Sequence, residues 1–268
     1  MTLEEMFGLK GRVALVTGGS RGIGRMIVEG FLGAGIERVY ITARKGGELS
    51  DAAAQLGDKV VPIQGDISTM AGIEELAGEI AAREGKLDIL VNNAGAAWGA
   101  EFAEFPEDGW NKVMDLNVKT PFFLTQKLHG LLKAAASADR PAKVINITSV
   151  DGQRINPWET YSYQASKAAL IHLTRRMAAR LVKDHIYMTS LAPGAFPSNM
   201  NKVARDQAER SAQGIPSKRV GDKWDMGGSA VYLASRAGDY TVGETLTVDG
   251  GIVNAHLPTH FADPAGGL

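Results

Sequence analysis

The sequence predicts an α/β fold: a single-domain, Rossmann-type, doubly wound parallel sheet of about seven strands with helices on both faces. Short apolar runs alternate with helical patterns along almost the whole chain of 268 residues. The runs are nearly continuous in apolar residues, which is typical of strands buried on both faces. Right-handed crossovers between such strands produce a doubly wound sheet.

Seven segments have the composition of strands. They are VALVT (13–17), RVYIT (38–42), KVVPI (59–63), DILV (88–91), AKVINI (142–147), HIYMTSLA (185–192) and ETLTV (244–248). Helical patterns cover residues 22–32, 69–83, 107–135, 160–183 and 223–235. No linker or internal repeat divides the chain. We therefore expect one dinucleotide-binding and catalytic domain over residues 1–255 and a Gly- and Pro-containing C-terminal tail over residues 256–268.

The composition disfavours several classes of protein. A formal net charge of -1 gives no reason to expect nucleic acid or an anionic membrane as a partner. The absence of cysteine excludes disulfides and thiolate catalysis, and it fits a cytoplasmic location. The acidic N-terminus lacks a long apolar core, and no apolar run is long enough for a membrane helix, so neither a secretory signal nor a membrane span is expected. Only His256 and His260 stand four apart, with Pro258 between them, so we expect no metal site.

A glycine-rich turn, TGGSRGIG (17–24), follows the first predicted strand directly. Gly18 permits a tight turn, Gly22 lets the backbone approach a pyrophosphate, and Gly24 permits close helix–strand packing. The N-terminus of the next helix offers free N–H groups and partial positive charge. The turn therefore predicts a dinucleotide site, although its spacing is G-x3-G-x-G instead of the commoner G-x-G-x-x-G. The alternative is a glycine-rich connection that binds nothing.

The charges after the second strand predict NADP(H). This strand ends in TARK (42–45), without the acid that an NAD enzyme places there for the ribose hydroxyls. Arg44 and Arg21 could bind a 2′-phosphate, with Lys45 as a weaker helper. Two charge-assisted hydrogen bonds would favour NADPH by roughly 3–6 kcal/mol before solvent screening. The alternative is that both arginines are solvated surface charges.

Tyr163 and Lys167 stand four residues apart, so they share one face of the predicted helix. A free phenol titrates near about 10, and lowering its pKa to about 7 requires roughly 4 kcal/mol. One ammonium about 4 Å away supplies this at an effective dielectric constant of about 20. The pair can therefore form an acid–base catalyst without histidine. The alternative is an ordinary amphipathic helix with a packed tyrosine and an exposed lysine.

These motifs together resemble the short-chain dehydrogenase/reductase family. The turn at 17–24, NNAG (92–95), Asn117, Ser149, Tyr163-x3-Lys167 and Pro193-Gly194 occur in that family's order. Within the family, SRGIG, VNNAG, AWG (97–99) and PGAFPS (193–198) make the chain look most like bacterial β-ketoacyl reductases of the rhamnolipid-biosynthesis type.

The resemblance implies an NADP(H)-dependent oxidoreductase that reduces a ketone or oxidises a secondary alcohol. Tyr163 would transfer the proton, and Lys167 would lower its pKa and hold the nicotinamide ribose. Ser149 would bind the substrate oxygen, and Asn117 would hold a water in a proton relay. The implied cofactor-binding residues are Gly18, Ser20, Arg21, Gly22, Ile23, Gly24, Arg44, Lys45, Asp66, Ile67, Asn92, Ala94, Gly95, Tyr163, Lys167, Pro193, Gly194, Phe196 and Ser198.

Within that set, Asp66 and Ile67 would lie at the adenine, and Asn92 and Gly95 would lie at its ribose. The nicotinamide carboxamide would be positioned by Pro193, Gly194, Phe196 and Ser198. Some of these positions have simpler structural interpretations. Asp66 and Ser68 could cap the next helix, Asn117 could bend its helix, and Pro193-Gly194 could be only a turn. Thr148 or Ser162 could act in place of Ser149.

The interval from Ser149 to Tyr163 is one residue longer than the commonest family spacing, so segment 151–160 must absorb it, for example as a bulge. Gln153, Trp158 and Tyr161 are candidate substrate contacts, and Trp98, Phe196 and a mobile segment at 199–213 are expected to shape the pocket.

A small-molecule carbonyl or alcohol, such as a 3-oxoacyl group, is the expected substrate, and a homo-oligomer (tetramer or dimer) is the expected assembly. An NAD-linked polyol or sugar dehydrogenase and a non-enzymatic NADP-sensing or scaffold protein remain as alternatives. An enoyl reductase would need Tyr-x6-Lys, but position 170 is Leu170.

Overall fold

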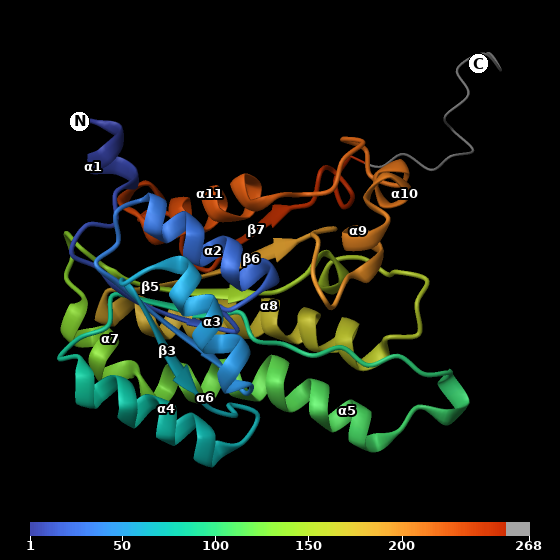
Figure 1. Cartoon of the computed structure of the whole chain (residues 1–268), viewed down its shortest axis with the longest axis horizontal. Helices are drawn as coiled ribbons and strands as arrows, with labels where there is room; N and C mark the ends of the chain where they lie inside the picture. Colours follow the sequence, from blue (N-terminus) through green and yellow to red (C-terminus); the bar gives the residue numbers. More distant parts are fainter. Residues whose placement is uncertain (256–268) are drawn as a thin grey trace.

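One sheet of seven strands forms the centre of the fold in the computed structural model, which describes residues 1–255 (Figure 1). The strand order is β3-β2-β1-β4-β5-β6-β7, and every neighbouring pair is parallel. This confirms the predicted Rossmann-type fold. The predicted C-terminal tail, with His256 and His260, lies outside the described residues.

The strands fall within a few residues of their predicted positions. They are β1 (Val13–Thr17), β2 (Arg38–Ala43), β3 (Val60–Gln64), β4 (Ile89–Asn92), β5 (Ala142–Ile147), β6 (Ile186–Pro193) and β7 (Thr245–Val248). The α-helices are α1 (Leu3–Phe7), α2 (Gly22–Gly33), α3 (Gly46–Leu56), α4 (Met70–Arg83), α5 (Glu107–Met114), α6 (Thr120–Lys127), α7 (His129–Ala135), α8 (Tyr161–Leu181), α9 (Lys202–Asp206), α10 (Ala208–Gln213) and α11 (Lys223–Ala234). Short 3₁₀ or π segments are η1 (Phe102–Glu104), η2 (Asp115–Lys119), η3 (Val150–Gly152), η4 (Val182–Asp184) and η5 (Arg236–Gly238).

Helices cover both faces of the sheet, which explains why whole strands such as β1 and β5 are buried (Figure 1). One apolar core packs α2, α3 and α11 against the sheet through residues such as Phe31, Leu49 and Met226. The other packs α4, α6, α7 and α8 through residues such as Ile73 and Leu124. The two layers leave the carboxyl ends of the strands as the edge where loops gather.

Helix α2, which begins at the glycine-rich turn, lies directly against α11. A Cβ atom added to Gly30 would lie 2.7 Å from the Cα atom of Gly227, so the two backbones touch where the helices cross. The position of the turn therefore depends on α11, a helix that follows it by about two hundred residues in the sequence.

The single helix expected over residues 107–135 was wrong in detail, because it is divided into α5, the π segment η2, α6 and α7. Pro121 lacks an N–H and cannot donate to the carbonyl of Asn117 four residues earlier. The chain adjusts by a wider turn, in which the N–H of Thr120 donates to the carbonyl of Asp115. Asn117 thus lies in a π-type turn.

Several helices were not predicted. Helix α3 begins with Gly46 and Gly47, whose low helix propensity masked the apolar pattern behind them. The segment expected to be mobile at residues 199–213 contains α9 and α10, and the acidic N-terminus contains the short helix α1. Over residues 1–255, no helix is long and apolar enough to cross a membrane, and no group of three or more His, Asp or Glu side chains could hold a metal ion.

Candidate active site

The four predicted catalytic residues come from three parts of the chain near the carboxyl edge of the sheet. Ser149 follows β5 and is the N-cap residue of η3, where its hydroxyl accepts a hydrogen bond from the N–H of Asp151 at 3.1 Å. Tyr163 and Lys167 lie one turn apart on α8, as their spacing predicted. Asn117 is 1% exposed and comes from η2.

Lys167 is buried, and its ammonium donates a hydrogen bond of 2.8 Å to the carbonyl of Ile147, the last residue of β5. Its Nζ atom lies 5.6 Å from the centroid of the Tyr163 ring. Burial lowers the pKa of Lys167 to about 8, since the charged form has lost much of its contact with water. The lysine is thus fixed to the end of a strand and lies beside the phenol.

The predicted lowering of the Tyr163 pKa is wrong for the chain without a bound dinucleotide. Burial raises the pKa of Tyr163 to about 12, and the nearby carboxylate of Asp151 adds to the rise. A hydrogen bond with the Ser149 hydroxyl acts in the opposite direction. Desolvation of the buried phenol, which spacing along the helix does not reveal, outweighs the effect of the nearby ammonium. At neutral pH the phenol is therefore protonated and able to donate a proton.

Asn117 connects the loop after β4 to α8. Its Oδ1 atom accepts from the N–H of Ala96 at 2.8 Å, and its Nδ2 atom donates to the carbonyl of Ala96 at 2.9 Å and to the hydroxyl of Ser166 at 2.9 Å. Ser166 in turn donates to the carbonyl of Tyr163 at 2.7 Å. A Cβ atom added to Gly95 would lie 3.1 Å from the Asn117 Oδ1 atom and 3.7 Å from the Lys167 Nζ atom. These contacts bring Gly95, Asn117 and Lys167 into one cluster.

The glycine-rich turn leads into a helix whose N-terminus has no side-chain cap. Arg21 is the N-cap residue of α2 and makes no capping hydrogen bond, whereas Thr69 caps α4 and Asp222 caps α11. The first N–H groups of α2 thus keep their capacity to bind an anion. Gly18 and Gly22 have φ values of +66° and +54°, which glycine adopts without strain. Ser20 lies within this turn, and Ile23 packs against the core beneath it.

The NNAG segment is fixed to the same turn by the last residue of β1. The Thr17 hydroxyl accepts from the N–H groups of Asn93 and Ala94, both at 2.9 Å, and the Asn93 amide donates to the Thr17 carbonyl at 2.7 Å. The side chain of Asn92 points elsewhere, since its amide donates to Asn146 inside the sheet at 2.8 Å. Any part that Asn92 plays in holding a ligand therefore belongs to its backbone.

Two of the three cations predicted for the 2′-phosphate pair with an acid, Glu48, that is not among the predicted site residues. Arg21 and Lys45 each lie 3.0 Å from the carboxylate of Glu48. Arg44 is exposed and directly follows β2. The clue to Glu48 was its spacing of three from Lys45, which became meaningful only once residues 46–56 were known to be helical.

Asp66 and Ile67 lie at the end of β3, next along the same edge of the sheet. The Asp66 carboxylate accepts from the N–H of Ser68 at 3.0 Å and from its hydroxyl at 2.7 Å. Burial opposes ionisation, but these hydrogen bonds and the charge of Arg44 keep the pKa of Asp66 below its ordinary value. Thr69, and not Asp66 or Ser68, caps α4, so the helix-capping alternative does not account for Asp66.

The loop after β6 reaches back to the glycine-rich turn. A Cβ atom added to Gly22 would lie 3.2 Å from the Cβ atom of Ser198, and the N–H of Gly194 donates to the carbonyl of Val248 at 2.9 Å. Phe196 is only 2% exposed and belongs to the apolar core, with its ring against Gly221. Its side chain thus attaches the loop to the apolar core.

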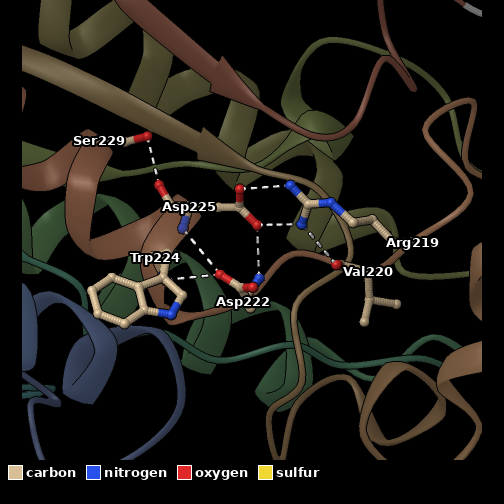
Figure 2. A network of polar contacts seen from close by, with 6 residues as sticks. All are labelled: Arg219, Val220, Asp222, Trp224, Asp225 and Ser229. Atoms are coloured by element: carbon tan, nitrogen blue, oxygen red, sulfur yellow. Dashed lines mark hydrogen bonds and ion pairs between the residues drawn. The ribbon is translucent and has the colours of Figure 1, made fainter.

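The C-terminal end of this loop is joined to α11 by a contact between Arg219 and Asp225, as Figure 2 shows. The guanidinium of Arg219 faces both carboxylate oxygens of Asp225, with one pair at 2.8 Å, and this contact lowers the pKa of Asp225 to about 2. Asp225 also closes a capping box with Asp222. The loop from Pro193 to the start of α11 is therefore held at both ends, by the sheet and by the helix that packs on α2.

The structure places the candidate substrate contacts, and Trp98, which was expected to shape the pocket, in different surroundings. Gln153 hydrogen-bonds with the Thr247 hydroxyl of β7 at 2.9 Å. The Trp98 ring covers Gly109 of α5, with the Lys112 ammonium 5.2 Å from its centroid. Trp158 is 62% exposed.

Tyr161 packs with Phe102 and Phe105 at centroid distances of 5.7 Å, in an aromatic groove that also includes Trp110. Two helical positions separate Tyr161 from Tyr163, so the two rings leave α8 in different directions. Segment 151–160, which is expected to absorb the extra residue before α8, contains the end of η3 and a loop in which buried Asn156 accepts from the N–H of Trp158 at 2.8 Å.

The sequence was compared with protein families and with curated proteins. The short chain dehydrogenase family model matches residues 12–209. The chain is 47% identical over 255 residues to the rhamnolipids biosynthesis 3-oxoacyl-[acyl-carrier-protein] reductase of Pseudomonas aeruginosa, a match that covers 93% of this chain and 99% of that protein. It is 35% identical over 252 residues to a 2-dehydro-3-deoxy-D-gluconate 5-dehydrogenase of Dickeya dadantii, covering 91% of this chain and 96% of that one.

Solved structures of similar proteins have the same fold. The Pseudomonas aeruginosa RhlG/NADP active-site complex superposes with a TM-score of 0.89 at 44% identity, covering 93% of this chain and 99% of that one. A gluconate 5-dehydrogenase from Burkholderia cenocepacia, in complex with NADP and tartrate, gives a TM-score of 0.86 at 32% identity, covering 95% of this chain and 100% of that one. The chain therefore belongs to the short chain dehydrogenase family, as the order of its motifs predicted.

Proposed function

We propose that this protein is an NADPH-dependent ketoreductase, which reduces the carbonyl group of a small molecule to a secondary alcohol. The observation that carries the proposal is the convergence of Ser149, Tyr163, Lys167 and Asn117 at the carboxyl edge of the sheet. The family assignment and the relatives that are 3-oxoacyl reductases support the same reaction class.

The residues at the glycine-rich turn suit a dinucleotide. The uncapped N-terminus of α2 suits a pyrophosphate, and the cations at the end of β2 suit a 2′-phosphate. The similar structures that contain NADP support this choice of cofactor. When bound, NADPH supplies the hydride that reduces the carbonyl carbon. The residues proposed to hold it are Gly18, Ser20, Arg21, Gly22, Ile23, Gly24, Arg44, Lys45, Asp66, Ile67, Asn92, Ala94, Gly95, Tyr163, Lys167, Pro193, Gly194, Phe196 and Ser198.

The protein's own side chains bind the substrate oxygen and supply its proton. Ser149 donates a hydrogen bond to the oxygen and stabilises the negative charge that develops on it. Tyr163, protonated at neutral pH, donates the proton that completes the alcohol. The buried ammonium of Lys167 stabilises the phenolate that remains, and Asn117 holds the surrounding loop in place. The protonated phenol is the form that reduction requires, whereas oxidation of an alcohol would require the phenolate as the base.

The substrate we propose to test first is a 3-oxoacyl thioester, the class named for the relative with 47% identity. A second candidate is a keto sugar acid, because relatives with 35% and 36% identity are 2-dehydro-3-deoxy-D-gluconate 5-dehydrogenases. The shared catalytic residues do not distinguish these substrates, whose shapes and polarity differ.

The test compares kcat/KM for 3-oxoacyl thioesters of several chain lengths and for 2-dehydro-3-deoxy-D-gluconate, each with NADPH and with NADH. We expect NADPH-dependent turnover of the thioesters. Turnover of the sugar acid alone would favour the second candidate, and NADH as the better coenzyme would overturn the cofactor assignment. Binding of NADPH without turnover of any carbonyl in a broad panel would favour a sensing role.

We further propose a cytoplasmic homo-oligomer, a tetramer or dimer, with the domain comprising residues 1–255. The absence of cysteine from the sequence is compatible with a reducing compartment. An apolar groove lined by Met114, Val118, Phe122 and Leu173 on α5, η2, α6 and α8 offers a surface for a second copy. Light scattering on the purified protein measures the assembly, and a monomeric mass would contradict this part of the proposal.

A further inference from the structure

Glu48 forms two ion pairs at the end of the glycine-rich turn. Its two carboxylate oxygens accept hydrogen bonds from different cations, one from Arg21 and one from Lys45, both at 3.0 Å. The contact with Lys45, followed by the charge of Arg21, holds the pKa of Glu48 below its ordinary value. An ionised carboxylate thus lies between two side chains that the proposed function assigns to a 2′-phosphate.

We propose that Glu48 acts as an internal competitor of the 2′-phosphate and so determines how strongly the protein discriminates NADPH from NADH. This inference rests on the proposed function. In the free protein the carboxylate substitutes for the phosphate as the anion between the two cations. A ligand with a 2′-phosphate must displace it, whereas a ligand with a free 2′-hydroxyl leaves the ion pairs intact.

The strength of these ion pairs determines the size of the effect. The side chains of Arg21, Lys45 and Glu48 are 60%, 73% and 53% exposed, so each pair is a weak surface contact. A phosphate monoester carries a charge of about −1.5 to −2 at neutral pH and offers three acceptor oxygens, so it competes successfully with one carboxylate. Glu48 therefore weakens binding of the phosphate without preventing it.

Glu48 also lies in the first turn of α3, where its charge is favourable to the helix. This structural role predicts a change in stability but no preference between ligands. Competition predicts the opposite pattern, a change in affinity that depends on the 2′-phosphate. The two roles can therefore be separated by measuring a pair of ligands that differ only in that group.

The test is isothermal titration calorimetry of the whole protein with 2′,5′-ADP and with 5′-AMP. For Glu48→Gln, we expect the dissociation constant of 2′,5′-ADP to fall about three- to tenfold at low salt, where tenfold corresponds to about 1.4 kcal/mol. The dissociation constant of 5′-AMP should change less than about twofold. Glu48→Lys should tighten 2′,5′-ADP further, and the gain should shrink in about 0.5 M salt.

Glu29→Gln is the matched control, because it removes the same charge and a similar ion pair, with Arg25 at 3.0 Å, farther along α2. If Glu48→Gln binds 2′,5′-ADP no more tightly than this control does, the competitor role of Glu48 is overturned while the cofactor assignment stands. A wild-type protein that binds 2′,5′-ADP no better than 5′-AMP would overturn the cofactor assignment and the role of Glu48 together.

Discussion

The ammonium of Lys167 lies 2.8 Å from the carbonyl oxygen of Ile147, so a residue of α8 is anchored at the end of β5. Ser149 follows that strand by two residues, and Tyr163 precedes Lys167 by one helical turn. One hydrogen bond thereby fixes the cation relative to the two groups proposed to contact the substrate oxygen. Because Lys167 is buried, the contact is protected from competing water.

Replacing Tyr163 with Phe should leave the fold intact and remove the proton donor. We expect kcat for ketone reduction to fall by about 10²–10⁴-fold, the usual contribution of general acid catalysis. The measurement is steady-state turnover, together with calorimetric binding of NADPH to confirm that the coenzyme site persists. Wild-type turnover by this variant would refute the proposed mechanism.

Replacing Lys167 with Met should abolish turnover and yet stabilise the fold at neutral pH. The folded-state pKa of about 8 lies below the reference value of 10.5, so keeping this group charged in the folded protein opposes folding. Well below pH 8, the buried charge lowers the stability of the folded protein by roughly 2–5 kcal/mol. This cost disappears as pH rises toward the unfolded pKa.

Thermal unfolding of wild type and Lys167→Met at several pH values tests this sign. The difference in Tm should favour the variant at pH 7 and shrink as pH rises from about 8 to about 10. A variant that is less stable at pH 7 would mean that the hydrogen bond to Ile147 outweighs the cost of burying the charge.

Replacing Gly24 with Ala should disrupt the glycine-rich turn. The added Cβ atom would lie 2.5 Å from the Asn93 Nδ2 atom and closer still to the carbonyl oxygen of Gly18. We expect a loss of stability of about 1–3 kcal/mol, typical of overpacking, and at least tenfold weaker NADPH binding.

The matched control for Gly24 is Gly33, the last residue of the same helix, where an added Cβ atom meets nothing within 4 Å. Gly33→Ala should keep coenzyme affinity and raise stability by about 0.4–1 kcal/mol. Urea unfolding and calorimetry measure both quantities. Equal effects of the two substitutions would show that the turn does not require glycine at position 24.

Replacing Asp184 with Asn should lower stability at neutral pH and make it less sensitive to acid. His129, Lys133 and Arg180 surround this carboxylate at 3.1, 2.8 and 2.9 Å, and hydrogen bonds from Lys133, Arg180 and His129 hold the pKa of Asp184 well below its ordinary value. Since the folded pKa is depressed, the contribution is complete above the reference value of 3.8 and is lost as pH falls below it.

The check is Tm as a function of pH from about 7 down to about 2, where the difference between the wild type and Asp184→Asn should stay constant above about pH 4 and narrow progressively below it. Asp206→Asn is a suitable control, because Asp206 is 54% exposed and pairs only with its neighbour Arg205 among the ion pairs of residues 1–255. Parallel curves for wild type and Asp184→Asn would contradict the proposed contribution of Asp184.

The sequence determined most of the architecture. Seven apolar runs identified the strands, since a strand buried on both faces must be apolar along its length. The order of TGGSRGIG, Asn117, Ser149 and Tyr163-x3-Lys167 also predicted the family, because each motif has its chemical meaning in a fixed relation to a strand end.

Sequence patterns did not predict the structure at two places where local preference and the rest of the fold compete. The π-type turn at Asn117 depends on how the backbone adjusts to Pro121, and helix α3 forms despite Gly46 and Gly47 because Leu49 is buried against the sheet. The first outcome depends on backbone geometry and the second on packing energy, and a pattern of apolar residues contains neither.

What only the tertiary structure decided is the environment of each charge. The sequence placed an ammonium one turn from Tyr163 and cations after β2, but the raised pKa of the phenol and the pairing of Arg21 with Glu48 depend on groups distant in sequence. Desolvation and Coulomb energy depend on distances in space and on the exclusion of water. These quantities become defined only when the chain has packed.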